Sequence, residues 1–97
     1  MKALMITYNQ SLNEMIMDIL DNNSVRGFTK WEDVQGRGTK KGEPHYGSHA
    51  WPSKNICIIA VVEPEKATVV IEKLNSLNKN AEKQGLTVYV WDVYQGV

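Results

Sequence analysis

The sequence contains very little cysteine and no excess of charge of either sign. Cys57 is the single cysteine among 97 residues, so no intrachain disulfide can form, which is typical of a reducing compartment. Lys and Arg total 11, as do Asp and Glu, and the formal net charge is zero. Because nucleic-acid-binding domains usually carry a basic excess or a basic stripe, this balance argues against a nucleic-acid partner.

Long hydrophobic runs are also missing. No stretch approaches the roughly 18 apolar residues that a membrane-spanning helix needs. The apolar run at the N-terminus gives way to polar residues at 9–11, too soon for a signal peptide. We therefore expect a cytoplasmic protein with no direct membrane insertion, and the length predicts a single domain, residues 1–97.

Four segments have the patterns of β-strands: residues 2–8, 28–34, 56–62 and 87–93. The continuous apolar run at 56–62 predicts a central strand that is covered on both faces. The last strand is expected to point Val88 and Val90 to one face of the sheet and Tyr89, Trp91 and Val93 to the other.

Two segments between these strands have helical spacing. The first begins at a Ser11–Glu14 capping box, and its apolar stripe is Leu12, Met15, Ile16, Ile19 and Leu20. The second begins at Pro64, a favourable first-turn residue, and Gly85 is its expected C-cap. Its stripe consists of Ala67, Val70, Ile71, Leu74, Leu77 and Ala81.

The element order is therefore βαββαβ. With right-handed crossovers, this order predicts an α+β ferredoxin-like sandwich, in which a four-stranded antiparallel sheet carries both helices on one face. The opposite face would then carry some of Trp31, Tyr89 and Trp91. Since a large apolar face left open suggests an interaction site, we expect this face to be buried against another subunit.

A long polar loop, residues 35–55, separates the second and third strands. Its first part combines glycines, which let backbone amides approach an anion, with basic side chains that add positive charge. The candidate ligand-binding residues are Gly36, Arg37, Gly38, Lys40, Lys41 and Gly42. The same composition also occurs in hairpins whose only role is mobility, and the residues alone leave both interpretations open.

The segment 34–42 resembles the root of the T-loop in PII signalling proteins. In that family a strand ends in valine and a G-x-G-x-x-K-G pattern comes after it, which falls here on Gly36, Gly38, Lys41 and Gly42. The element order and the position of the loop agree with the same family. The resemblance implies a regulatory homotrimer, not an enzyme. It would sense a small ligand such as a nucleotide or an anion in clefts between subunits, and contact a membrane transporter, an efflux protein or an enzyme through its loop.

The chain departs from the family pattern at two places. The family carries a second phosphate loop with a G-x-G-K pattern before the last strand, where this chain has residues 80–85, Asn-Ala-Glu-Lys-Gln-Gly. The family also has basic residues beyond that strand, whereas this chain ends Gln95-Gly96-Val97. These departures predict weak nucleotide binding, or a ligand smaller than ATP.

The middle of the loop carries other candidate site residues. His45 and His49 are the only histidines, and their spacing can place two imidazoles on one divalent metal ion, although two solvated loop histidines would have the same spacing without any metal. Tyr46 and Trp51 are candidate partner-binding residues, because large aromatic side chains are enriched at interaction hot spots. Trp51 could equally fold back over the edge of the sheet.

Two other functions remain as alternatives to a PII-like regulator. The first is a metal-binding protein comparable to the CutA family or associated with metal efflux, which would use His45 and His49. The second is a small enzyme such as an acylphosphatase, but the expected arginine is missing from the loop after the first strand, at residues 9–11. Cys57 lies in an apolar strand and is expected to be a small buried hydrophobic residue.

Overall fold

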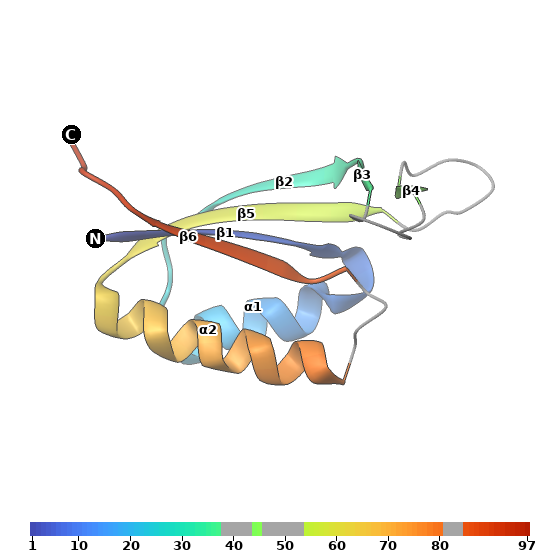
Figure 1. Cartoon of the computed structure of the whole chain (residues 1–97), viewed down its shortest axis with the longest axis horizontal. Coiled ribbons are helices and arrows are strands. Elements are labelled where there is room, and N and C mark those ends of the chain that lie inside the picture. Colours follow the sequence, from blue (N-terminus) through green and yellow to red (C-terminus); the bar gives the residue numbers. More distant parts are fainter. Residues whose placement is uncertain (38–43, 46–53, 81–84) are drawn as a thin grey trace.

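The computed structural model describes residues 1–37, 44–45, 54–80 and 85–97. Its main sheet has four antiparallel strands in the order β2-β5-β1-β6, formed by Thr29–Val34, Asn55–Val62, Lys2–Asn9 and Thr87–Asp92. Helices α1 (Asn13–Asn22) and α2 (Pro64–Lys79) lie together on one face of that sheet (Figure 1). The predicted ferredoxin-like βαββαβ sandwich is therefore confirmed.

The hydrophobic core lies between the helices and the two central strands. Alternate residues of β1 and β5 point into it, because successive side chains of a strand face opposite sides of the sheet. Both helices contribute residues spaced three or four apart. The fully buried members include Leu4, Ile6, Tyr8, Ile16, Leu20, Ile58, Val70 and Leu74.

The start of α1 differs from the sequence prediction. A 3-10 turn, η1 (Gln10–Leu12), precedes the helix, and the N-cap residue of α1 is Leu12 rather than Ser11. Asn9 is buried, and its side-chain oxygen accepts a hydrogen bond from the backbone N–H of Ser11 at 2.9 Å. The turn that leaves β1 is thus capped by Asn9. In the apolar stripe, Met15 is exposed, while Met17 packs against the core.

Helix α2 begins as predicted, with Pro64 in its first turn, and buries Ala67, Val70 and Leu74. Ala81, the last residue of the predicted stripe, lies outside the described residues. The C-cap is Asn80, so the assignment of Gly85 as the C-cap was wrong. Gly85 instead has a φ of +66° immediately before Leu86 and β6, a backbone conformation that glycine adopts without steric cost.

Strand β5 is central, but only one of its faces is covered in the single chain. Ile56, Ile58, Ala60 and Val62 are buried under the helices, whereas Cys57 and Ile59 are partly exposed and Val61 is exposed. The prediction that both faces are covered is therefore wrong for the single chain. Both helices lie on the same side, and the described part of the chain places no second layer over the other side (Figure 1).

Candidate functional site

The loop that carries the predicted ligand residues leaves the sheet between β2 and β5, and β2 is irregular just before it does so. Trp31 pairs with Cys57 and Val34 pairs with Asn55, so the chain from Trp31 to Val34 contains one residue more than the chain from Asn55 to Cys57. Such an insertion is a β-bulge, which bends a strand and redirects the chain beyond it. Within the bulge, Asp33 has a φ of +58°.

A short hairpin not predicted from the sequence lies beyond the bulge. Strands β3 (Gly36–Arg37) and β4 (Pro44–His45) form a two-residue antiparallel ladder, in which Gly36 pairs with His45 and Arg37 with Pro44. The interpretation of residues 35–55 as a loop without regular structure was therefore wrong at these four positions, and at Asn55, the first residue of β5. The pairing places the backbone of a predicted ligand residue directly opposite that of a predicted metal ligand.

Polar groups at the ends of β1 and β5 support the base of this hairpin. Asn9 pairs with Asn55 at the last step of their ladder, and the backbone N–H of Gln10 donates to the carbonyl oxygen of Lys54 at 2.8 Å. The side-chain nitrogen of Asn55 lies 3.5 Å from the position that a Cβ at Gly36 would occupy. The start of the candidate ligand segment therefore rests against a strand end that is held in place by hydrogen bonds.

One ion pair spans the two chain segments that enter and leave the loop. Lys54 Nζ lies 3.4 Å from Asp33 Oδ1, and both side chains are largely exposed to solvent. Exposed pairs of this kind contribute little, typically about 0–1 kcal/mol. The bulge and the hairpin ladder therefore do more than this ion pair to fix the path of the chain at the base of the loop.

The described residues contain only part of the predicted site. The backbones of Gly36, Arg37 and His45 are placed by the hairpin. The other predicted residues lie outside the described part of the chain: Gly38, Lys40, Lys41, Gly42, Tyr46, His49 and Trp51. Within the described ranges, no group of three or more His, Cys, Asp or Glu residues could hold a metal ion.

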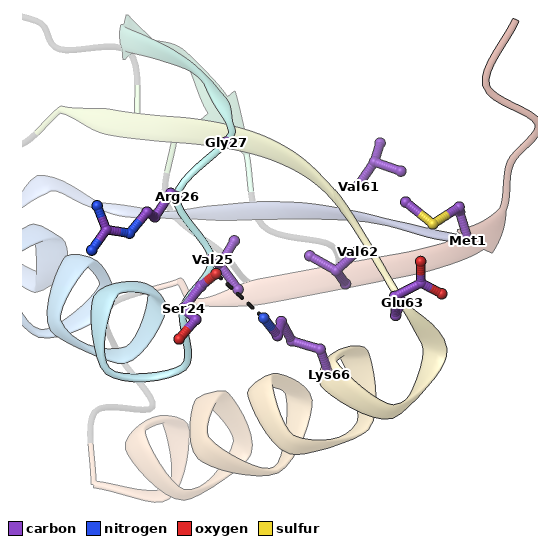
Figure 2. A pocket seen from close by; sticks show the side chains of 9 residues that line it. All are labelled: Met1, Ser24, Val25, Arg26, Gly27, Val61, Val62, Glu63 and Lys66. Carbon is purple, nitrogen blue, oxygen red and sulfur yellow. Dashed lines mark hydrogen bonds between the residues drawn. The ribbon is translucent and has the colours of Figure 1, made fainter.

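A hollow at the opposite end of the sheet was not predicted. It has a volume of about 240 Å³ and is lined by Met1, Ser24, Val25, Arg26, Gly27, Val61, Val62, Glu63 and Lys66 (Figure 2). Lys66 Nζ donates to the carbonyl oxygen of Ser24 at 3.3 Å across it. Three segments far apart in sequence build this hollow, and no local motif marks any of them, which is why sequence patterns alone missed it.

The sheet face opposite the helices, here called the open face, carries many apolar side chains, interrupted by threonines at positions 7, 29 and 87. The registers align its side chains in rows: Trp31 beside Cys57, Ile59 beside Met5 and Tyr89, and Val61 beside Ala3 and Trp91. The predicted placement of Trp31, Tyr89 and Trp91 on this face agrees with these registers. All three aromatic side chains are about half exposed. Partial burial raises the pKa of the Cys57 thiol.

No described helix has the length and apolar character that crossing a membrane requires. The comparison with curated proteins gives no match. Among solved structures, the chain is similar to CPII, a nitrogen regulatory PII-like protein from Thiomonas intermedia. The form bound to ADP and bicarbonate is 26% identical with a TM-score of 0.80, and the alignment covers 99% of this chain and 88% of CPII.

Two further structures extend the comparison. CPII bound to ADP, AMP and bicarbonate is 25% identical with a TM-score of 0.75, over 99% of this chain and 92% of CPII. A PII-like protein from Thermus thermophilus is 20% identical with a TM-score of 0.66, over 95% and 85% of the two chains, and shows the shared fold. A family model described as nitrogen regulatory protein P-II matches residues 1–96. Together with the βαββαβ fold and the loop between β2 and β5, this match establishes that the chain belongs to the nitrogen regulatory protein P-II family.

Proposed function

We propose that this chain is a trimeric, cytoplasmic regulatory protein that senses an adenine nucleotide together with a small anion such as bicarbonate. It would act without catalysis, by contacting a transporter or an enzyme through the loop between β2 and β5. The observation that carries this proposal is the likeness, over 99% of the chain, to CPII bound to ADP and bicarbonate.

The ligand segment of this proposal consists of Gly36, Arg37, Gly38, Lys40, Lys41 and Gly42. The chain has no net charge, so an anion must be attracted by a local concentration of cations, and three basic residues fall within positions 36–42. Charge-assisted hydrogen bonds from such side chains contribute roughly 1.5–3 kcal/mol each. The hairpin ladder supports the proposal, because it fixes Gly36 and Arg37 at the start of the segment.

The proposal also predicts a modest affinity for nucleotide. A G-x-G-K phosphate loop is absent from residues 80–85, where the sequence has a single glycine, Gly85, at the end. Without those glycines, fewer backbone amides can approach a phosphate chain closely. A bound anion beside the nucleotide would add interactions, so the two ligands should bind better together than separately.

Isothermal titration calorimetry tests the proposal directly. We expect ADP and AMP to bind the wild-type protein, and bicarbonate to tighten their binding. Arg37→Ala and Lys41→Ala should each weaken nucleotide binding by about tenfold, the equivalent of one charged hydrogen bond. Lys73→Ala is the matched control, because Lys73 is an exposed lysine on α2.

Absence of binding of ADP, AMP and bicarbonate at millimolar concentrations would refute the proposal. Zinc titration in the same instrument tests the predicted metal pair. Zinc binding that disappears in both His45→Ala and His49→Ala, with no response to nucleotide, would replace the nucleotide sensor by a metal-binding protein.

A further inference from the structure

A strained backbone conformation lies immediately before the ligand segment. Asp33 has a φ of +58°, and apart from Ser24 it is the only non-glycine residue with a positive φ among the described residues. This left-handed region is uncommon for residues other than glycine, although Asp and Asn tolerate it better than most. Backbone strain of this kind gathers at functional positions. Its place in β2 therefore indicates a structural role.

The role is visible in the register on either side of Asp33. Before the bulge, the paired residue numbers of β2 and β5 sum to 88, as in Trp31 with Cys57; after it they sum to 89, as in Val34 with Asn55. A shift of one residue reverses the face to which each later side chain points. The conformation at Asp33 therefore sets the register in which the chain leaves β2 toward Gly36 and Arg37.

The contact between Gly36 and Asn55 depends on this shift. Asn55 pairs with Val34, and its side-chain nitrogen lies 3.5 Å from the Cβ position of Gly36. In a regular ladder Val34 would instead lie opposite Lys54, and the segment after it would be displaced by one residue along β5. The hairpin of Gly36–Arg37 with Pro44–His45 would then start from a different position.

The ion pair of Asp33 with Lys54 is not sufficient to fix this geometry. The two atoms are 3.4 Å apart, but the side chains are 67% and 46% exposed, so solvent screens their attraction. The backbone conformation and the charge of Asp33 can be separated experimentally. Glycine keeps the conformation without the charge, asparagine does so with nearly the same shape, and valine opposes the conformation.

We propose that Asp33 is a positioning residue for Gly36, the first residue of the ligand segment: its left-handed backbone creates the bulge that sets Gly36 against Asn55. This inference rests on the proposed function for the identity of the ligand, whereas the geometry around Asp33 does not depend on that function. Asp33 itself touches no ligand in this scheme. It acts through the register of the strand that leads into the loop.

Calorimetry with ADP and bicarbonate, on four variants, tests the binding consequence. Asp33→Val should weaken binding by about tenfold, because the valine opposes a conformation whose cost is of that order. Asp33→Gly and Asp33→Asn should bind within about twofold of wild type, since exposed ion pairs contribute little. Ser24→Val is the matched control: Ser24 has a φ of +60° at the other end of the sheet, so the valine adds similar strain away from the loop.

Hydrogen exchange of the backbone amides that bond across the ladder of β3 and β4 provides a second measurement that needs no ligand. Exchange should be about tenfold faster in Asp33→Val than in Ser24→Val if the bulge supports the hairpin. Unchanged binding by Asp33→Val, or an equal loss in Ser24→Val, would overturn the inference. If the wild-type protein binds none of these ligands, the proposed function fails, and exchange alone decides: equal rates in the two valine variants overturn the positioning role.

Discussion

At the scale of single residues, Tyr8 combines deep burial with an ionisable group. It is 1% exposed, and its hydroxyl donates to the side-chain oxygen of Asn13 at 2.7 Å. Burial, and then the nearby charges of Glu32 and Cys57, raise the pKa of Tyr8 from 10.0 to about 12. The hydrogen bond joins the central strand to the first turn of α1, so the phenol is both a core residue and a polar link between two elements.

The raised pKa predicts a loss of stability in alkali. The unfolded chain releases this proton near pH 10, whereas the folded chain retains it to about pH 12, so the free energy of unfolding should fall as the pH rises through this window. Urea denaturation between pH 9 and about pH 12 should show a shallower fall in Tyr8→Phe. At pH 7 the same variant should lose about 1 kcal/mol with the hydrogen bond. Tyr94→Phe, at a fully exposed tyrosine, should behave like the wild type; an identical alkaline profile in Tyr8→Phe would contradict the argument.

The residues that sequence patterns could predict are those governed by periodicity. Leu12, Ile16 and Leu20 were assigned to the core because their spacing places them on one side of a helix, and all three are buried. Met15 and Ser11 were misassigned because the helix starts after a 3-10 turn, which alters the phase of its first residues. The bulge at Asp33 has no signature in hydrophobic pattern, since aspartate is common in ordinary turns as well.

At the scale of elements, two glycines at loop ends make different demands on the backbone. Gly85 has a φ of +66° before β6, whereas no positive φ occurs at Gly36, and a Cβ there would make only an ordinary contact with Asn55. Gly85→Ala should therefore lower the free energy of unfolding by about 1 kcal/mol. Gly36→Ala should change it little.

Urea denaturation of both alanine variants at pH 7 measures this difference. A cost at Gly36 equal to that at Gly85 would show that the backbone of β3 is strained in solution.

The difference between the two glycines also explains why the candidate site could be predicted only in part from the sequence. The glycine pattern of residues 36–42 predicted a ligand segment, but the position of Gly36 depends on long-range pairing, such as that of Val34 with Asn55.

At the scale of the whole molecule, the open face predicts self-association. Four large apolar side chains on this face are at least 40% exposed: Trp31, Val61, Tyr89 and Trp91. Large exposed apolar patches are uncommon on proteins that stay monomeric, so this face is expected to contact a partner. We expect sedimentation equilibrium to give a trimer at micromolar concentration. Tyr89→Lys should produce monomers, because a lysine ammonium would be buried without a partner in the interface.

Val90→Lys is the control for this prediction. Val90 comes after Tyr89 in β6 and points to the opposite face, and the two side chains have comparable exposure. A wild-type monomer, or a Tyr89→Lys variant that still forms trimers, would remove the open face as the interface. Loss of the trimer in both lysine variants would point instead to a general destabilisation of β6.

The topology of the sheet also has a consequence for the time at which the protein can fold during its synthesis. Strand β1 lies between β5 and β6, and Lys2 pairs with Val62 on one side and with Asp92 on the other. The Lys2–Asp92 ion pair of 2.6 Å and the bond from the Val93 N–H to the Met1 carbonyl close this second ladder. Because ribosomes add about 5–20 residues per second, the first strand made waits several seconds for its last neighbour. During that interval the nascent chain exposes an unpaired apolar β1 edge, which is the stage at which chaperone binding would protect it most.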